Sequence, residues 1–219
     1  MQLLAAAEFR PAAAAPPLAA GEIHLWFFPH WEKQRDATDA LPVRALLAAY
    51  LRVAPATLLF RRREHGKPEL TGLQFNLSHT GTALLLGVSR DVELGVDLER
   101  TTRPVRSAPE LAQRWFAPRE AQALTDLPEA AQTPAFLRLW TCKEAMLKCS
   151  GAGISSGLDR VEFELSTTGS IRGVRGDEPW QVLALQPDAA HIGALAFRGK
   201  PAPVRAFVMQ AIAAGAQSG

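Results

Sequence analysis

Two acidic side chains, Asp97 and Glu99, stand two residues apart in the segment GVDLE. Because successive side chains of a β-strand point to opposite faces, a strand here would present both carboxylates on one face. Two ionised carboxylates this close repel each other unless a cation lies between them, and a hard divalent metal ion with oxygen ligands fits that role. The other interpretation is a solvated strand end, and this short segment taken alone favours it.

A second group of charges occurs in the segment LWTCKEAMLKCSGAG. Trp140, Glu144 and Lys148 are spaced i, i+4 and i+8, so on a helix they share one face, with Lys143 beside them. A solvent-exposed Glu–Lys pair is the commoner meaning of this spacing. The neighbouring residues are mostly apolar, however, which indicates that the charges line an interior cleft. Glu144 would then supply a third oxygen ligand opposite the two strand carboxylates.

Three carboxylates around Mg²⁺ favour a substrate that carries phosphates, because Mg²⁺ keeps coordination positions for water and phosphate oxygens. The candidate phosphate-binding groups are Gly66, Lys67 and Pro68 on a loop, and Ser78 and His79 just before a predicted strand. A serine next to a histidine also suggests a hydrolytic nucleophile and its base. Adjacent side chains on a strand point apart, so this pair is not expected to form such a dyad.

The overall composition narrows the class of protein. The chain has 219 residues, of which 47% are hydrophobic and 21% charged, which is typical of a folded protein with one large domain or two small ones. A net charge of +2 gives no general case for binding nucleic acid or an anionic membrane, and the basic run at 61–63 is too short to make one. No apolar run reaches the roughly 20 residues of a membrane span, so no membrane association is expected.

The two cysteines indicate a reducing compartment. Cys142 and Cys149 lie in the same predicted helix, roughly 10 Å apart along its axis, which is too far for a disulfide. Two thiols also cannot complete a structural zinc site, which takes four ligands. We therefore expect two reduced thiols in a cytoplasmic protein.

Hydrophobic periodicity and turn residues divide the chain into two α+β halves. We expect a flexible Ala/Pro-rich lead-in at 1–20, an N-terminal subdomain at 21–100, a linker at 101–109 and a C-terminal subdomain at 110–219. The two residues between the predicted strands 82–89 and 92–99 suggest an antiparallel hairpin. The other predicted strands are 22–29, 160–165, 180–185, 191–197 and 204–209, and the predicted helices are 41–53, 110–115, 118–127 and 134–149.

Five motifs in a fixed order carry a family resemblance: HGKPEL, FNLSHTG, LGVDLER, RWFAPREAQAL and LWTCKEAMLKCSGAG. In this order they resemble the larger, monomeric class of 4′-phosphopantetheinyl transferases, the class that activates surfactin synthetase. The resemblance implies transfer of the 4′-phosphopantetheine arm of coenzyme A to a serine of an apo acyl or peptidyl carrier protein, with release of adenosine 3′,5′-bisphosphate. It also implies a requirement for Mg²⁺, with Mn²⁺ as the alternative ion. The implied fold is a pseudodimer of two similar α+β halves, each an antiparallel sheet packed on helices, with coenzyme A between them.

The resemblance also implies roles for individual residues. It makes Asp97, Glu99 and Glu144 the metal ligands. Glu144 would also accept the serine proton, and Lys148 would stabilise or protonate the departing phosphate. The implied coenzyme A contacts are Gly66, Lys67 and Pro68 in the nucleotide pocket, Ser78, His79 and Arg44 at phosphates, and Lys143. Glu120 matches an acidic motif position that the family associates with holding water or a ligand.

Two other functions stay open from the sequence. A Mg²⁺-dependent coenzyme A pyrophosphohydrolase would use the same carboxylates with water as the nucleophile. A noncatalytic module that binds coenzyme A or carrier proteins would keep the fold without turnover, although it would have no need of the clustered charges. The basic residues Arg114 and Arg119 are the expected docking surface for the acidic helix of a carrier protein.

Overall fold

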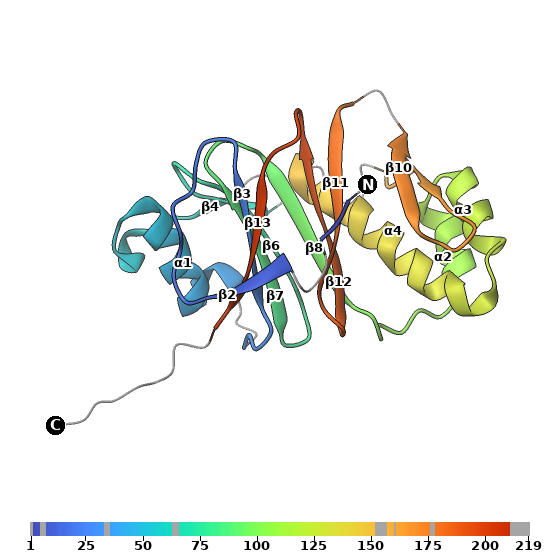
Figure 1. Ribbon diagram of the computed structural model, residues 1–219, viewed down its shortest axis with the longest axis horizontal. Helices are drawn as coiled ribbons and strands as arrows, with labels where there is room; N and C mark the ends of the chain where they lie inside the picture. The colour runs from blue at the N-terminus through green and yellow to red at the C-terminus, as the bar shows by residue number, and fades with distance from the viewer. Residues whose placement is uncertain are drawn as a thin grey trace.

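The computed structural model describes residues 2–4, 8–32, 36–62, 66–151, 157–159, 161–175 and 178–210 of the chain. Its elements form four layers, which Figure 1 shows from one side to the other: helix α1, a first sheet, a second sheet, and helix α4 with α2 and α3. The predicted α+β class is confirmed. None of the described helices is long and apolar enough to cross a membrane.

The first sheet contains five described strands in the order β2-β13-β3-β7-β6. Strand β7 runs antiparallel to both of its neighbours, β3 and β6, whereas β13 lies parallel to both β2 and β3. The prediction of purely antiparallel sheets is therefore wrong at this edge. The bounds are Phe9–Ala12 (β2), Ile23–Phe28 (β3), Gln74–Thr80 (β6), Ala83–Ser89 (β7) and Val204–Met209 (β13).

Helix α1 (Leu41–Leu51) covers the outer face of the first sheet, between the short 3-10 helices η2 (Ala37–Asp39) and η3 (Pro55–Thr57). Pro42 lies in the first turn of α1, where its missing N–H costs no helical hydrogen bond. Alternation along β3 follows the layers. Trp26 and Phe28 belong to the cluster under α1, whereas Leu25 and Phe27 belong to the cluster between the two sheets.

The second sheet has the described strand order β1-β11-β12-β8, and α4 packs across its outer face. Smaller pairs of strands, β9 with β10 and β4 with β5, lie outside the two main sheets. The bounds are Gln2–Leu4 (β1), Arg61–Arg62 (β4), Pro68–Glu69 (β5), Leu94–Arg100 (β8), Glu162–Leu165 (β9), Ile171–Arg175 (β10), Trp180–Asp188 (β11) and His191–Arg198 (β12). The helices are Ala108–Trp115 (α2), Pro118–Thr125 (α3) and Glu129–Ser150 (α4).

The two halves exchange strands, which differs from the division expected at 101–109. Strand β8 precedes the expected linker but pairs with β12 of the second sheet, whereas β13, at the end of the described chain, joins the first sheet. The predicted hairpin is also wrong: β7 pairs with β3 and β6, and β8 lies in the other sheet. Turn length predicted a local partner for β8, but its nonlocal partner β12 pairs with it along seven residues.

The expected lead-in at 1–20 is not a lead-in. Strand β1 pairs in parallel with β11 of the second sheet, and β2 pairs in parallel with β13 of the first. Phe9 is buried in the cluster between the sheets, where its ring meets Phe27 edge-on. Pro11 is tolerated because β2 is an edge strand. The Ala/Pro-rich composition concealed a segment that contributes to both sheets.

Candidate active site

The candidate site lies where the two sheets meet, at strands β6 and β8. Among the described strands, these two end their respective sheets and lie next to each other (Figure 1). Hydrogen bonds of side chains connect them. Asn76 Oδ1 accepts the main-chain N–H of Val96 at 2.8 Å, and Ser78 Oγ donates to Asp97 Oδ1 at 2.9 Å. Polar groups of the two sheets therefore bind each other at this junction.

Gly95 lets helix α4 approach the backbone of β8. A Cβ atom at this position would lie 2.0 Å from the carbonyl oxygen of Ala145 and 2.3 Å from the main-chain nitrogen of Cys149. Strand alternation places Asp97 and Glu99 on the same face as Gly95, while Val96 belongs to the core between the sheets. The two carboxylates therefore stand beside the C-terminal half of α4.

Asp97, a buried residue, forms an ion pair with the partly exposed Lys148 of α4. Lys148 Nζ lies 2.6 Å from Asp97 Oδ1 and 2.9 Å from Ser78 Oγ. Asp97 is only 5% exposed, and its second oxygen, Oδ2, is buried with no hydrogen-bond partner among the described residues. A buried carboxylate oxygen without a partner is costly, which makes this atom a candidate for binding a cation.

Glu144 lies one turn before Lys148 on α4, and its Oε1 atom is also buried with no hydrogen-bond partner in the described structure. Burial raises the pKa of Glu144, and the negative charge of Asp97 raises it further. The positive charges of Lys148 and Arg103 act in the opposite direction, and Glu99 adds to the rise. Glu144 therefore shares one electrostatic environment with the two carboxylates of β8.

Glu99 is held by two residues that sequence reasoning missed. Its Oε1 pairs with Arg103, and its Oε2 accepts a long hydrogen bond of 3.4 Å from Thr80 Oγ1. Burial raises the pKa of Glu99, Arg103 lowers it, and Asp97 raises it again. The Arg103 guanidinium also lies 5.4 Å from the ring of Trp140. Its spacing of four residues from Glu99 was the only signal in the sequence.

The acidic residues fit a divalent cation, although they do not form a ready-made ligand set. Among the described residues, no three His, Cys, Asp or Glu side chains are arranged to hold a metal ion. Asp97 is engaged by Lys148, and Glu99 by Arg103. The unpartnered oxygens Asp97 Oδ2 and Glu144 Oε1 nevertheless supply hard, buried donors of the kind that Mg²⁺ binds.

The predicted nucleotide loop lies close to the same junction. Lys67 Nζ donates to the carbonyl oxygen of Cys149 at 2.9 Å and to that of Leu94 at 3.3 Å. Gly66 has a left-handed φ of 80°, which favours glycine, and its carbonyl oxygen accepts from Arg62. Lys67 and Pro68 also line a polar cavity of about 240 Å³ together with residues of β4, β5 and β6. The loop thus borders both the helix end and a cavity.

Two of the other predicted phosphate contacts occupy different layers. His79 is exposed on β6 next to Ser78, and its ring lies 4.9 Å from that of Trp31, which the sequence analysis missed. Arg44, by contrast, donates to the carbonyl oxygens of Pro55 and Leu58 on the α1 side of the first sheet. The carboxylates lie beyond the other face of that sheet. The structure therefore places Arg44 on the α1 side of the sheet, and its expected contact with a phosphate stays a prediction.

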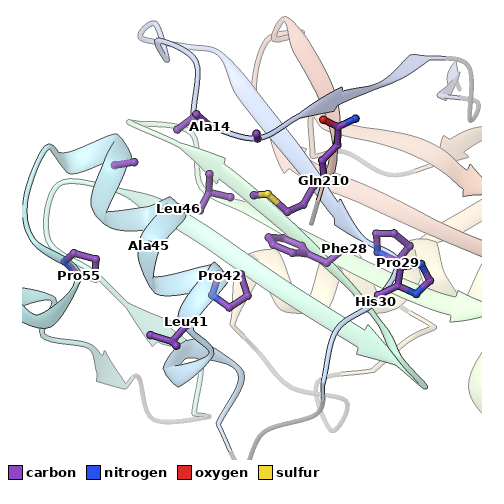
Figure 2. A pocket seen from close by; sticks show the side chains of 14 residues that line it. Ala14, Phe28, Pro29, His30, Leu41, Pro42, Ala45, Leu46, Pro55 and Gln210 are labelled. Carbon is purple, nitrogen blue, oxygen red and sulfur yellow. The ribbon is translucent and has the colours of Figure 1, made fainter. Parts of the chain in front are cut away.

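An apolar cavity of about 570 Å³ also lies on the α1 side (Figure 2). It opens between α1, the end of β3 and the end of β13, and Phe28, Leu46 and Met209 are among its lining residues. None of the carboxylates of the candidate site lines it. This cavity is therefore separate from the candidate site.

Lys143 was expected to touch coenzyme A, and the structure contradicts this. The side chain is 2% exposed, and its Nζ lies 2.7 Å from the Leu158 carbonyl oxygen, 2.6 Å from that of Val161 and 2.8 Å from Glu120 Oε2. An ammonium group has three donors, and all three are used. Lys143 therefore faces the interior of the C-terminal half rather than the cleft.

Glu120, the partner of Lys143, is also an interior residue. It is 1% exposed, and its carboxylate accepts the main-chain N–H groups of Phe163 at 2.7 Å and Ala117 at 2.8 Å. These bonds leave no access for a ligand or bulk water. The carboxylate instead joins the start of α3, strand β9 and helix α4.

Comparison with known proteins agrees with the family that the five motifs suggested. The family described as the 4′-phosphopantetheinyl transferase superfamily matches residues 93–196, which include β8 and α4. The 4′-phosphopantetheinyl transferase HetI of Nostoc sp. is 36% identical over 180 residues, covering 80% of this chain and 74% of that protein. The 4′-phosphopantetheinyl transferase psf-1 of Bacillus pumilus is 34% identical over 176 residues, covering 78% and 73% of the two chains.

A vertebrate protein is also similar. The L-aminoadipate-semialdehyde dehydrogenase-phosphopantetheinyl transferase of Xenopus laevis is 32% identical over 154 residues, or 63% of this chain. The matched part spans about half (51%) of the Xenopus protein. Since the similarity to HetI extends over most of both chains, and the family match contains the strand and the helix that build the site, this protein belongs to the 4′-phosphopantetheinyl transferase family.

Proposed function

We propose that this protein transfers the 4′-phosphopantetheine arm of coenzyme A to a serine hydroxyl of an apo carrier protein. In this reaction a bond forms between the serine oxygen and the β-phosphorus of coenzyme A, and the bond from that phosphorus to the bridging oxygen of the diphosphate breaks. The serine proton is removed, and adenosine 3′,5′-bisphosphate leaves. The observation that carries the proposal is the pair of buried, unpartnered oxygens, Asp97 Oδ2 and Glu144 Oε1, beside the Lys148 ammonium.

Glu144 is the proposed proton acceptor. Burial and the charge of Asp97 raise the pKa of this carboxyl, which moves it closer to the working pH where a general base is most effective. Its Oε1 is buried and accepts no hydrogen bond from the described residues, so a serine hydroxyl or a water that enters the junction would meet an unoccupied acceptor. The reaction thus gains a base without breaking an existing hydrogen bond to that atom.

Lys148 is the proposed partner of the leaving group. Its side chain is 30% exposed, so it reaches both the buried Asp97 carboxylate and the open side of the junction. The residue lies one helical turn from Glu144, which lets the base and the cation act on one diphosphate. A lysine at this position can neutralise or protonate the phosphate oxygen of the departing bisphosphate.

Asp97, Glu99 and Glu144 would hold Mg²⁺, or Mn²⁺ in its place. The bound ion would neutralise charge on the diphosphate as the bond to the leaving phosphate loosens. Asp97 can offer its unpartnered Oδ2, whereas Glu99 would have to share or exchange an oxygen that Arg103 or Thr80 already engages. All three acidic side chains come from one chain, which supports action as a monomer.

Coenzyme A and the carrier protein are proposed to meet at the same junction. Lys67 and Pro68 line the polar cavity next to β6, and His79 and Ser78 lie on β6 itself, so the nucleotide and phosphates would lie along this strand. Arg114 and Arg119 are exposed on α2 and α3 and are the proposed contacts for an acidic carrier helix. This assignment rests on charge and exposure.

Intact mass measurement tests the function directly. We expect an apo carrier protein incubated with the enzyme, coenzyme A and Mg²⁺ to gain the mass of one phosphopantetheine group. Glu144→Ala or a chelator should abolish the gain. Release of phosphopantetheine without any modified carrier would identify a pyrophosphohydrolase instead. Binding of coenzyme A with neither product would identify a noncatalytic module.

A further inference from the structure

The buried pair Glu120–Lys143 lies outside the proposed reaction, yet Lys143 is the residue directly before Glu144. Its ammonium is fixed by three oxygen acceptors from three places in the chain: Leu158, Val161 and Glu120. The aromatic rings of Phe116 and Phe163 enclose it, with centroids 5.2 Å and 5.5 Å from Nζ. Such a group has a single position and cannot follow a rotation of its helix.

The carboxylate of Glu120 extends this arrangement to neighbouring elements. One oxygen accepts the N–H of Phe163 in β9, and the other accepts the N–H of Ala117 at the start of α3 in addition to the Lys143 ammonium. The pair therefore ties α4 to α3 and β9. The hydrogen bonds of Glu120 and Lys143 are directional. They therefore fix the orientation of the two side chains as well as the distance between the elements that carry them.

On the neighbouring side, α4 is in backbone contact with β8. Gly95 meets the main chain at Ala145 and Cys149, so the helix cannot move closer to the strand. Successive residues of a helix are separated by about 100° around its axis. With Lys143 fixed on one side and Ala145 pressed against Gly95, the direction of Glu144 between them is determined.

We propose that Glu120 and Lys143 are positioning residues, which set the rotation of α4 so that the Glu144 carboxylate faces Asp97. This inference rests on the proposed function, in which Glu144 binds the metal ion and accepts a proton. Stability alone is a poor explanation of the pair, because replacing a buried ion pair by apolar residues of similar size is often neutral or stabilising. A positioning role accounts for the directional bonds.

Three variants test the proposal: Lys143→Met, Glu120→Leu, and the double variant that combines them. Each single change leaves one buried charge unpaired, so both single variants should lose thermal stability. The double variant removes both charges and should regain part of the lost melting temperature, since the buried main-chain groups that bonded to the pair stay without partners. It does not restore the bonds to Leu158, Val161 and Phe163, so the orientation of Glu144 should stay relaxed.

Metal binding provides a readout that does not depend on turnover. Mn²⁺ affinity of the folded protein, measured by electron paramagnetic resonance, should fall by about 10–100-fold in the double variant, as is typical when groups that orient a ligand are lost. With carrier protein and coenzyme A, kcat should fall with it, while the KM for coenzyme A stays near the wild-type value. Leu47→Ala, in the core under α1, is the control: it should lower the melting temperature and leave Mn²⁺ affinity unchanged.

The outcomes separate this inference from the proposed function. A double variant with wild-type Mn²⁺ affinity and kcat, at any melting temperature, would show that the pair does not position Glu144 and would overturn the inference. Wild-type protein that binds Mn²⁺ but never modifies a carrier would overturn the proposed function. Loss of Mn²⁺ affinity in the double variant would still support the positioning role in that case.

Discussion

The carbonyl oxygen of Ala145 occupies the place where a side chain on Gly95 would begin, 2.0 Å from the ideal Cβ position. This contact between α4 and β8 brings the carboxylates of the strand next to Glu144. It also explains why the acidic strand segment starts with a glycine. The distance between β8 and α4 at the site is therefore set by the absence of a side chain at Gly95 as well as by the side chains that are present.

Gly95→Ala should separate the strand from the helix. The added methyl group meets only backbone atoms, which cannot turn away, so we expect a loss of about 1–3 kcal/mol in unfolding free energy and a marked loss of transfer activity. Thermal melting and the mass assay measure both effects. Gly173→Ala is the matched control, since no atom lies within 4 Å of its ideal Cβ position; equal effects in the two variants would contradict this account.

Glu144→Gln should stabilise the metal-free protein at alkaline pH while abolishing activity. The folded-state pKa of Glu144 is raised, so at acidic pH both states bind the proton and the carboxyl group carries no penalty. As pH rises through the raised pKa, the folded protein must carry a buried charge and loses stability. With a chelator present, the melting temperature of the variant should exceed that of the wild type at pH 8 and match it near pH 4. If the melting temperature of the variant at pH 8 is lower than that of the wild type, the ionised Glu144 carboxylate does not destabilise the fold and this account is wrong.

Lys148→Met should act mainly on the chemical step. Loss of the cation removes the proposed partner of the departing phosphate, and we expect kcat to fall by about 10²-fold or more, with a smaller change in the KM for coenzyme A. Steady-state kinetics with an apo carrier protein measures both constants. Lys200→Met, at an exposed lysine after β12, is the control and should retain wild-type kinetics. A change in KM alone would assign Lys148 to ground-state binding.

Arg114→Glu combined with Arg119→Glu should weaken binding of the carrier protein and leave binding of coenzyme A unchanged. Both side chains are exposed on neighbouring helices, so their reversal repels an acidic partner without disturbing the core. The apparent KM for carrier protein should rise and its salt dependence should weaken. Reversal of Arg138 and Arg198, both exposed, changes the net charge by the same amount at other places. The same increase in both double variants would point to a nonspecific charge effect.

The buried His24 should make folding sensitive to mild acid. Its Nδ1 lies 2.7 Å from the Tyr50 hydroxyl, and burial lowers the pKa of the imidazole more than Glu22 raises it. At neutral pH the His24 imidazole is mostly uncharged in both the folded and the unfolded state. Below about pH 6.5 the His24 imidazole is protonated in the unfolded chain but stays neutral in the folded protein, so the free energy of unfolding falls. Between pH 7.5 and 5.5, wild type should lose roughly 1 kcal/mol more than His24→Gln; equal losses in denaturant titrations would contradict a neutral His24.

Local patterns predicted the part of the site that depends on one element at a time. Strand alternation put Asp97 and Glu99 on one face, and helical spacing put Glu144 and Lys148 on another, because backbone geometry fixes both. Helical spacing could not assign Lys143, because only tertiary folding brings its acceptors near: two main-chain carbonyls and the Glu120 carboxylate. It also gave no hint that α4 and β8 touch through Gly95.

The fold shows the same limit at a larger scale. Most strands and helices were predicted from periodicity, since burial on one face leaves a repeat in the sequence. The partner of β8 was not, because two intervening residues suggested a hairpin while the complementary surface lay almost a hundred residues later, in β12. Strands β1 and β2 were missed because the Ala/Pro-rich composition around them gives a weak strand signal, although the two strands pair in two different sheets.

The exchange of β8 and β13 between the sheets has a consequence for how the molecule comes apart. Each half of the chain lacks a strand that the other half provides, so neither half has a complete sheet by itself. Heating should therefore melt both halves in one cooperative transition, with a single calorimetric peak. Proteolytic cleavage between α2 and β8 should leave two fragments that stay associated, because each continues to complete the other.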